Sequence, residues 1–307
     1  MNLNKPKFWD SETLSIWSIL LLPLTAIYLS ILLLKKKITK ENSFNIQIIC
    51  VGNIYIGGTG KTPLVIKLNS LLENKRKISV IKKNYPNQYD EINLLKKYCK
   101  VSCENTRELA INNSIQQNFD LAILDDGFQD TKIKKNYSIL CFSSSQGIGN
   151  GLVLPSGPLR EPLKNLQNAD LVVINGQINK KLENTIKSHN PKIEITYSHY
   201  KILNKEKYIN KNYYIFSGIG NNENFLNLLK NSNISVIDYK FYPDHYVYTS
   251  NELEKLKKNA IDKNLILLTT EKDFLRIDEN KRDNIEYLST ELEIQDEEKL
   301  VQRILNL

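Results

Sequence analysis

Residues 57–62 read Gly57-Gly58-Thr59-Gly60-Lys61-Thr62, and this stretch decides the fold. It follows the apolar run of residues 46–51 and precedes residues 62–72, where apolar side chains recur at helical spacing. The pattern predicts a strand, a glycine-rich loop and a helix. Such a loop presents backbone N–H groups and a helix N-terminus to phosphate oxygens. We expect all six residues to bind ATP, with the Lys61 ammonium at the β- and γ-phosphates and the Thr62 hydroxyl on Mg²⁺.

The loop departs from the commonest phosphate-loop pattern at one position. The pattern G-x-x-x-x-G-K-[ST] requires glycine at position 55, where the chain has Tyr55. The variant Gly-Gly-x-Gly-Lys-Thr occurs in a large branch of P-loop proteins, and the strand–loop–helix context agrees with it. A glycine turn with a purely structural role is the alternative interpretation.

An acidic motif follows the apolar run of residues 121–124 and consists of Asp125 and Asp126. A phosphate loop requires a carboxylate at the end of a neighbouring strand to hold Mg²⁺. We therefore expect the metal site to consist of Thr62, Asp125 and Asp126. This pairing predicts ATP hydrolysis or phosphoryl transfer, but it does not identify the acceptor of the phosphoryl group.

The rest of the chain alternates between apolar runs and helical spacing. Further strands are expected at residues 78–81, 139–142 and 171–174, and a second set at 213–216, 234–239, 265–269 and 285–288. The alternating segment 192–200 is compatible with a strand that connects the two sets. This alternation predicts a P-loop NTPase-like parallel sheet with helices on both faces and a smaller second α/β domain. We expect three parts: an N-terminal membrane-associated helix with a basic flank over residues 1–40, a P-loop kinase domain over 41–200, and the second domain over 201–307.

The N-terminal part is apolar over residues 13–34, which include no charged side chain. A helix of this length would cross about the thickness of a bilayer core. Lys35, Lys36 and Lys37 follow, and the positive-inside rule then puts the rest of the chain in the cytoplasm. A helix lying in one leaflet is a serious alternative, and a buried core helix is a weaker one.

Composition sets wider bounds on the function. The 307 residues are 41% hydrophobic and 25% charged, which is typical of a globular protein. The net charge of +8 suits an anionic ligand or membrane face, or solubility alone. Cys99 and Cys103 lack the further ligands that a zinc site requires, so reduced cytosolic cysteines are expected. We expect neither a nucleic-acid partner nor an obligate protein partner.

Several motifs together resemble one family, the tetraacyldisaccharide 4'-kinases of lipid A biosynthesis. They are Val51-Gly-Asn53 with the loop and Pro63, Asp125-Asp-Gly-Phe-Gln129, Gly149-Asn-Gly151 with Leu154-Pro-Ser-Gly-Pro-Leu-Arg-Glu-Pro162, Gly218-Ile-Gly-Asn221, Tyr242-Pro-Asp-His245 and Thr270-Glu-Lys-Asp273. The resemblance implies transfer of the ATP γ-phosphate to the 4'-hydroxyl of a tetraacylated glucosamine disaccharide 1-phosphate, giving lipid IVA. It also implies an active site between two α/β domains, on the cytoplasmic side of the inner membrane, with a lipid-linked disaccharide and the membrane surface as partners.

The resemblance also implies roles for single residues. Asp90 and His245 would form the dyad that prepares the acceptor hydroxyl, with Lys61 as a further catalytic residue. A carboxylate-oriented imidazole accepts a proton near neutral pH. The segment before Asp90 is shorter than in the family and lacks its proline, so Asp125 and Asp126 remain alternatives for the dyad carboxylate. A structural histidine is the alternative interpretation of His245.

The substrate-binding residues implied by the resemblance are Gln129, Arg160 and Glu161. Their alternative roles are to fix the proline-rich loop or to support neighbouring residues. Asp130 stands where the family commonly has histidine. An extra carboxylate there would alter the charge near Mg²⁺.

The main rival function is a membrane-attached P-loop ATPase of the partitioning or protein-targeting type. That class commonly has a lysine at the start of the loop, where this chain has Ile56. Such an ATPase does not explain the motifs of residues 242–245 and 159–162.

Overall fold

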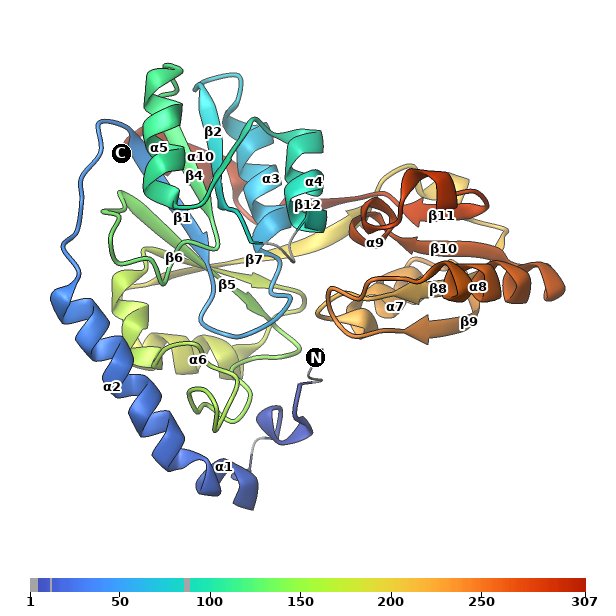
Figure 1. Cartoon of the computed structure of the whole chain (residues 1–307), viewed down its shortest axis with the longest axis horizontal. Helices are drawn as coiled ribbons and strands as arrows, with labels where there is room; N and C mark the ends of the chain where they lie inside the picture. Colours follow the sequence, from blue (N-terminus) through green and yellow to red (C-terminus); the bar gives the residue numbers. More distant parts are fainter. Residues whose placement is uncertain (1–4, 12, 86–88) are drawn as a thin grey trace.

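The computed structural model describes residues 5–11, 13–85 and 89–307. Within these residues, eight strands form a larger sheet in the order β12-β7-β6-β5-β1-β4-β2-β3 (Figure 1). Neighbouring strands are parallel apart from β12 and β7, which are antiparallel. The strands are β1 Gln47–Gly52, β2 Ile78–Lys83, β3 Val101–Glu104, β4 Leu121–Asp125, β5 Tyr137–Ser143, β6 Leu171–Asn175, β7 Glu194–Ile202 and β12 Thr290–Ile294.

Helices cover both faces of this sheet, because alternate residues of each strand point to opposite faces. In β1, Ile48 and Cys50 join a core with α5 (Arg107–Gln116) and α6 (Lys180–His189). Ile49 and Val51 join the opposite core. That core also contains α3 (Lys61–Leu72), α4 (Tyr89–Tyr98) and α10 (Glu297–Leu305). We call this sheet with its helices the larger unit.

The smaller unit is a four-stranded parallel sheet in the order β11-β10-β8-β9. Helices α7 and α8 pack on its two faces through separate apolar cores. Helix α9 contacts α4 of the larger unit. The elements are β8 Asn212–Ser217, α7 Asn222–Asn231, β9 Ser235–Phe241, α8 Ser250–Asp262, β10 Ile266–Thr270, α9 Glu271–Arg276 and β11 Ile285–Leu288; short 3₁₀ turns occupy Lys7–Trp9, Leu163–Asn168, Lys205–Lys207 and Glu279–Lys281.

The predicted α/β class with a mainly parallel sheet is confirmed. Two strands were not predicted, namely β3 and β12. Strand β12 pairs with β7 and is followed by α10, so the end of the chain returns to the larger unit. The division at residues 40 and 200 stays a prediction, and this return shows that the range 201–307 contributes to both sheets.

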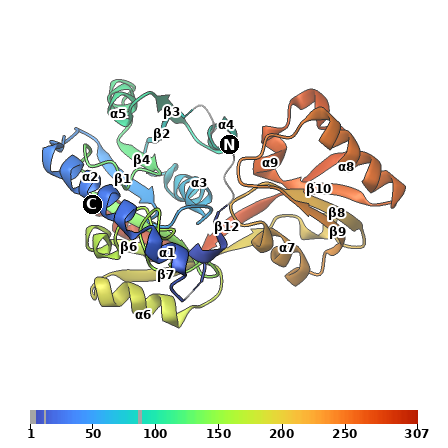
Figure 2. The ribbon, with the colours of Figure 1, turned by 60° about the horizontal axis from the view of Figure 1, so that its bottom comes forward.

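The apolar N-terminal stretch forms two helices, α1 (Ile16–Leu20) and α2 (Leu22–Ile38), where a single helix was expected. Leu21 closes α1 and Pro23 lies in the first turn of α2, where a proline is tolerated. Among the described residues, no helix combines the length and the apolar character required to cross a bilayer. Helix α2 lies against the larger unit, away from the smaller sheet (Figure 1, Figure 2).

Candidate active site

A cavity of about 650 Å³ lies between the two units. The larger unit lines it with the phosphate loop, residues 57–62, and with Asp126 and Arg160. The smaller unit contributes Asp244, His245 and Lys272. Residues that are distant in the sequence therefore line one cavity, which is the usual arrangement of a ligand site between domains.

The glycine-rich loop connects β1 to α3 as the sequence predicts. Gly57 and Gly60 have φ values of 115° and 91°, a left-handed conformation that favours glycine. The Asn53 amide donates to the Thr59 hydroxyl at 3.0 Å and to the Tyr55 carbonyl at 2.5 Å. These contacts hold the loop against the end of β1, so that the N-terminus of α3 points into the cavity, where an anion is favoured.

Tyr55, the residue that departs from the common pattern, is fully buried. Its hydroxyl donates to Asp10 at 2.7 Å and also contacts Lys5. The backbone of Ile56 donates to the carbonyl of Pro158 at 2.9 Å. The Tyr55 side chain therefore attaches the phosphate loop to the N-terminal segment, and the Ile56 backbone attaches it to the proline-rich loop.

The two predicted metal carboxylates lie beside the loop. Asp125 is fully buried at the end of β4, and its Oδ2 accepts from the Thr62 hydroxyl at 3.2 Å. Its Oδ1 has no hydrogen-bond partner among the described residues. Asp126 adopts a left-handed φ of 59° and contacts the Lys61 ammonium at 3.8 Å. Burial favours protonation of Asp126, but Lys61 and Arg160 together lower its pKa below the ordinary value.

This donor set fits Mg²⁺, which prefers oxygen ligands and usually retains water and phosphate ligands as well. A buried carboxylate oxygen without a partner, a hydroxyl and a second carboxylate lie together at the phosphate loop. Within the described part of the chain, no cluster of three or more His, Cys, Asp or Glu side chains could hold a metal on its own. The four cysteines are free, as the expectation of reduced cysteines requires.

The three predicted substrate residues take different positions. Arg160 lines the cavity and its guanidinium donates to both oxygens of Asp126, at 2.9 and 3.0 Å. Gln129 does not line it; its amide donates to the Asn53 carbonyl at 2.8 Å. Glu161 also lies outside the cavity wall and accepts from Asn165 at 2.6 Å. Burial raises the pKa of Glu161 above its ordinary value.

Asp130, which stands at the family's histidine position, forms an ion pair with Arg107 at 3.2 Å. Arg107 in turn donates to the backbone carbonyl of Asp126 at 2.6 Å. The Asp130 carboxylate is therefore neutralised by an arginine that also supports the turn of Asp126.

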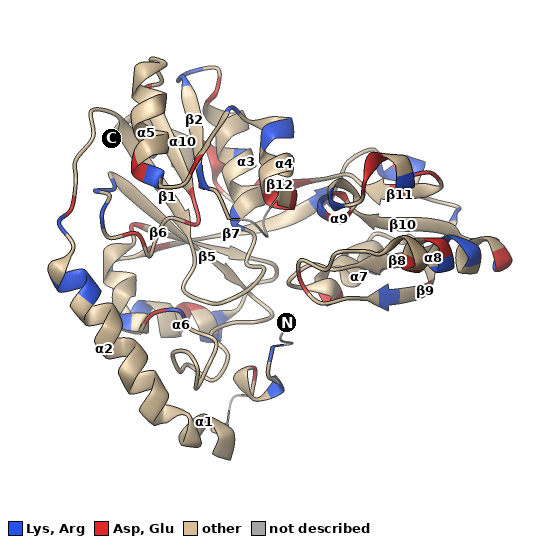
Figure 3. Cartoon of the chain, viewed as in Figure 1, with Lys and Arg blue, Asp and Glu red and all other residues tan. Residues whose placement is uncertain are grey.

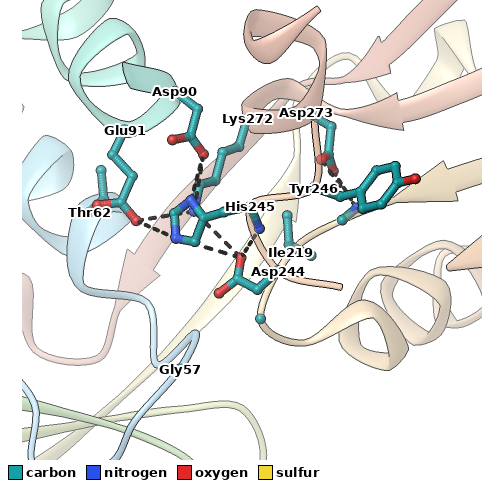
Figure 4. A network of polar contacts seen from close by, with 12 residues as sticks. Gly57, Thr62, Asp90, Glu91, Ile219, Asp244, His245, Tyr246, Lys272 and Asp273 are labelled. Carbon is teal, nitrogen blue, oxygen red and sulfur yellow. Dashed lines mark hydrogen bonds and ion pairs between the residues drawn. The ribbon is translucent and has the colours of Figure 1, made fainter. Parts of the chain in front are cut away.

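The structure brings the two residues of the expected dyad together (Figure 4). Asp90 lies in the first turn of α4 and is 4% exposed, whereas His245 follows β9 in the smaller unit. The Nδ1 of His245 lies 3.2 Å from Oδ2 of Asp90, and its Nε2 lies 3.7 Å from Glu91. The ring contact is not aligned as a hydrogen bond, since Nδ1 has no hydrogen-bond partner among the described residues.

Cations of the smaller unit surround the Asp90 carboxylate. Arg276 donates to it at 2.7 Å, and the Lys272 ammonium lies 3.5 Å away. Burial by itself would raise the pKa of Asp90, but His245, Lys272 and Arg276 hold it well below the usual range. Asp90 therefore stays ionised and can orient the imidazole.

His245 adopts a left-handed φ of 58°, which few residues other than glycine take up. Its backbone N–H donates to the Gly218 carbonyl at 3.1 Å and to the Asp244 side chain at 3.0 Å. Buried Asp273 holds the backbone N–H of Gly218 with both carboxylate oxygens, at 3.1 Å each. Asp273 also accepts from Arg276 at 2.8 Å, so the residues that surround Asp90 and His245 form one connected network.

Sequence reasoning missed three charged residues of this network as members of the site, namely Lys82, Glu91 and Arg276. Glu91 lies 3.1 Å from Lys272 and 2.6 Å from Lys82. A lysine inside the buried strand β2 was a visible signal, because a buried ammonium requires charged partners. The carboxylates that pair with this lysine could not be identified from the sequence.

The sequence profile of the family described as Tetraacyldisaccharide-1-P 4'-kinase matches residues 17–98 and 87–307. The tetraacyldisaccharide 4'-kinase of Pelagibacter ubique (strain HTCC1062) is 42% identical over 100% of this chain and 99% of its own length. The enzyme of the same name from Rickettsia felis (strain ATCC VR-1525 / URRWXCal2) is 33% identical, over 97% of this chain and 96% of its own length.

A solved structure has the same fold over nearly the whole chain. It is the "apo" form of LpxK from Aquifex aeolicus in complex with ATP, with a TM-score of 0.71 and 24% sequence identity. The match covers 95% of this chain and 99% of that one. Both units of the fold are therefore found together in that protein.

Proposed function

Because the chain belongs to the tetraacyldisaccharide 4'-kinase family, we propose that the cavity between its two units is where phosphoryl transfer takes place. The activity is ATP-dependent phosphorylation of a tetraacyldisaccharide 1-phosphate in lipid A biosynthesis. Family membership favours this phosphotransferase over the partitioning or targeting ATPase. The observation that supports the proposed location is one cavity that combines a phosphate loop with an imidazole next to a buried carboxylate.

The phosphate loop and Lys61 bind the ATP phosphates in this proposal. Backbone N–H groups and the α3 N-terminus provide fixed dipoles, and the Lys61 ammonium adds a full charge. Fixed groups of this kind stabilise charge that develops during transfer without having to reorganise. Thr62, Asp125 and Asp126 would hold Mg²⁺, which supplies charge neutralisation between the phosphates when it is bound.

His245 is the proposed general base. Its Nδ1 faces Asp90, which leaves Nε2 to accept the proton of the 4'-hydroxyl. The hydroxyl oxygen then bonds to the γ-phosphorus as the bond from that phosphorus to the β-phosphate oxygen breaks and ADP leaves. Asp90 stabilises the imidazolium that forms, and Arg276 and Lys272 keep Asp90 ionised. Asp125 and Asp126 are engaged with Thr62, Lys61 and Arg160, which supports Asp90 as the dyad carboxylate.

Arg160 is the proposed contact to the acceptor or to its phosphate, because it is the cation among the three predicted substrate residues and it lines the cavity. Gln129 and Glu161 then act through the backbone they support. Gln129 holds the Asn53 carbonyl beneath the phosphate loop, and Glu161 holds Asn165 in the following turn.

The N-terminal helices are the proposed membrane contact, because they bury polar residues and expose apolar ones, the reverse of an ordinary surface helix. The residues of α1 and α2 that the fold buries are Ser18 and Thr25. Leucine, isoleucine and tryptophan side chains of the same helices are more than 40% exposed; they include Ile16, Trp17, Leu20, Leu24, Ile27, Ile31 and Leu34. An exposed apolar surface of this kind suits insertion among acyl chains.

The basic end of α2 supports the same contact. Lys35, Lys36 and Lys37 lie in its last turn (Figure 3), where they could meet anionic headgroups. The proposal therefore assigns the chain to the cytoplasmic face of the inner membrane, where the lipid-linked disaccharide is reached with its acyl chains still in the bilayer.

The test of the proposed site is phosphate transfer from γ-labelled ATP to the tetraacyldisaccharide 1-phosphate in detergent with Mg²⁺. We expect Lys61→Ala to abolish labelled lipid, since electrostatic positioning dominates this chemistry. Near-normal turnover by that variant would contradict the assignment of the phosphate loop.

A further inference from the structure

Lys82 lies on β2, in the interior of the larger unit, and only 2% of its side chain is exposed. A buried ammonium is costly unless charged partners surround it. Lys82 has two: its Nζ donates to Asp125 at 2.7 Å and to Glu91 at 2.6 Å. The side chain therefore links two carboxylates with one fixed positive charge.

The first partner belongs to the proposed metal site. Lys82 and the Thr62 hydroxyl both engage Oδ2 of Asp125. The other oxygen, Oδ1, is buried and has no partner among the described residues. Lys82 therefore fixes the orientation of this carboxylate through Oδ2 and leaves Oδ1 without a protein partner among the described residues.

The second partner belongs to the helix that carries the dyad carboxylate. Glu91 and Asp90 are consecutive in the first turn of α4. Their other ion-pair partners in the described chain, His245, Lys272 and Arg276, all come from the smaller unit. Lys82 is the partner from the larger unit. Without it, the two carboxylates of α4 would be held mainly by the smaller unit.

We propose that Lys82 is a positioning residue of the transfer reaction. It fixes the position of the proposed metal carboxylate Asp125 relative to the dyad helix α4, which it contacts through Glu91. The inference rests on the roles proposed above for Asp90 and Asp125. The alternative is that Lys82 only stabilises the fold. The two differ in what its removal changes, because a structural role lowers stability without a selective effect on turnover.

The experiment compares full-length Lys82→Met, Glu91→Gln and the double variant. The measurements are kcat and KM for the lipid acceptor, the Kd for ATP with Mg²⁺, and thermal unfolding. A misplacement of about 1 Å costs on the order of 10²-fold in rate, so Lys82→Met should lower kcat by about that factor. The Kd for ATP should change less than kcat, because the phosphate loop and Lys61 stay in place while only the support of Asp125 is lost. The double variant should be no slower than the slower single variant, since both changes break one link.

Lys83→Met is the matched control, because it removes the same charge from the next position of β2. The Lys83 ammonium lies over the Tyr85 ring at 5.1 Å, and it has no ion pair among the described residues. Its kcat should stay within about threefold of the wild type, as expected for a site without charged partners. If Lys82→Met does not fold, Lys82→Gln keeps an N–H donor group but no charge and should show the same selective loss of kcat.

Two results would overturn the proposal while the kinase activity itself stands. One is a folded Lys82→Met or Lys82→Gln variant with wild-type kcat. The other is a double variant whose loss equals the product of the two single losses, which would make Lys82 and Glu91 independent. Absence of transfer by the wild-type protein would instead contradict the proposed function on which the inference rests.

Discussion

The imidazole of His245 lies 3.2 Å from the carboxylate of Asp90, although the first follows β9 in the smaller unit and the second begins α4 in the larger one. The pair therefore exists only where the two units meet. Arg276 and Lys272 approach the same carboxylate from α9. A general base assembled in this way depends on the relative position of the units as much as on the side chains themselves.

Asp90→Asn should lower kcat strongly and leave ATP binding nearly unchanged. The amide is neutral and cannot stabilise an imidazolium, and general base catalysis contributes about 10²–10⁴-fold. Steady-state kinetics with the lipid acceptor and a separate ATP titration measure the two effects. A loss confined to ATP affinity would contradict the dyad role.

The stability of the fold should depend on Asp90 in a defined pH range. Its pKa is depressed below the ordinary value of 3.8, so its contribution is complete above about pH 4 and is lost as the pH falls toward the folded-state pKa. The difference in Tm between the wild type and Asp90→Asn should therefore shrink as the pH falls below about pH 4. A difference that grew on acidification would show that the sign is wrong.

Gly220→Ala should disturb the contact between the units. A Cβ at position 220 would lie 2.4 Å from the backbone nitrogen of Gly58 and 2.9 Å from its Cα, in the phosphate loop. Backbone atoms cannot yield as a flexible side chain does, so the loop or the smaller unit must shift. We expect kcat/KM to fall by roughly 10- to 100-fold while the Tm changes little. Unchanged kinetics would indicate that the units need not approach this closely.

Replacing Ile16 and Ile31 with asparagine should weaken membrane binding. Both side chains are exposed, on α1 and α2, and burial of one isoleucine is worth about 1.5–3 kcal/mol. Flotation with vesicles of phosphatidylethanolamine and phosphatidylglycerol should show at least about a tenfold loss of binding. Ile261→Asn is the control, because Ile261 is as exposed as Ile16, at 68%, but lies on α8 of the smaller unit. Equal losses in both variants would contradict a membrane contact through α1 and α2.

The sequence predicted those parts of the fold whose signals are local. Strand β1, the loop and α3 could be recognised because apolar periodicity and glycines stand next to one another in the chain. Strand β12 could not, because its short alternating segment becomes a strand only by pairing with β7, which is distant in the sequence. The break between α1 and α2 was missed because continuous hydrophobicity obscured the helix boundary at residues 21–23.

The residues of the candidate site also fall into two groups: those that a local motif reveals and those that only the tertiary structure brings together. Lys61, Thr62, Asp125 and Asp126 could be proposed from two local motifs, and in the structure Thr62 contacts Asp125 while Lys61 contacts Asp126. The pairing of Asp90 with His245 was accessible through family resemblance alone, since a lone histidine has no specific pattern. Lys82, Glu91 and Arg276 were missed because an ion-pair network depends on how separate elements meet, which hydrophobic periodicity does not encode.

In the proposed mechanism, His245 acts on the acceptor hydroxyl while the phosphate loop binds ATP independently. The most direct measurement is transfer of labelled γ-phosphate to the tetraacyldisaccharide 1-phosphate by His245→Ala, with the Kd for ATP measured on the same preparation. We predict a loss of about 10²–10⁴-fold in kcat with a Kd for ATP close to the wild-type value. Full turnover, or an equal loss of turnover and ATP binding, would contradict the role of His245 as the general base.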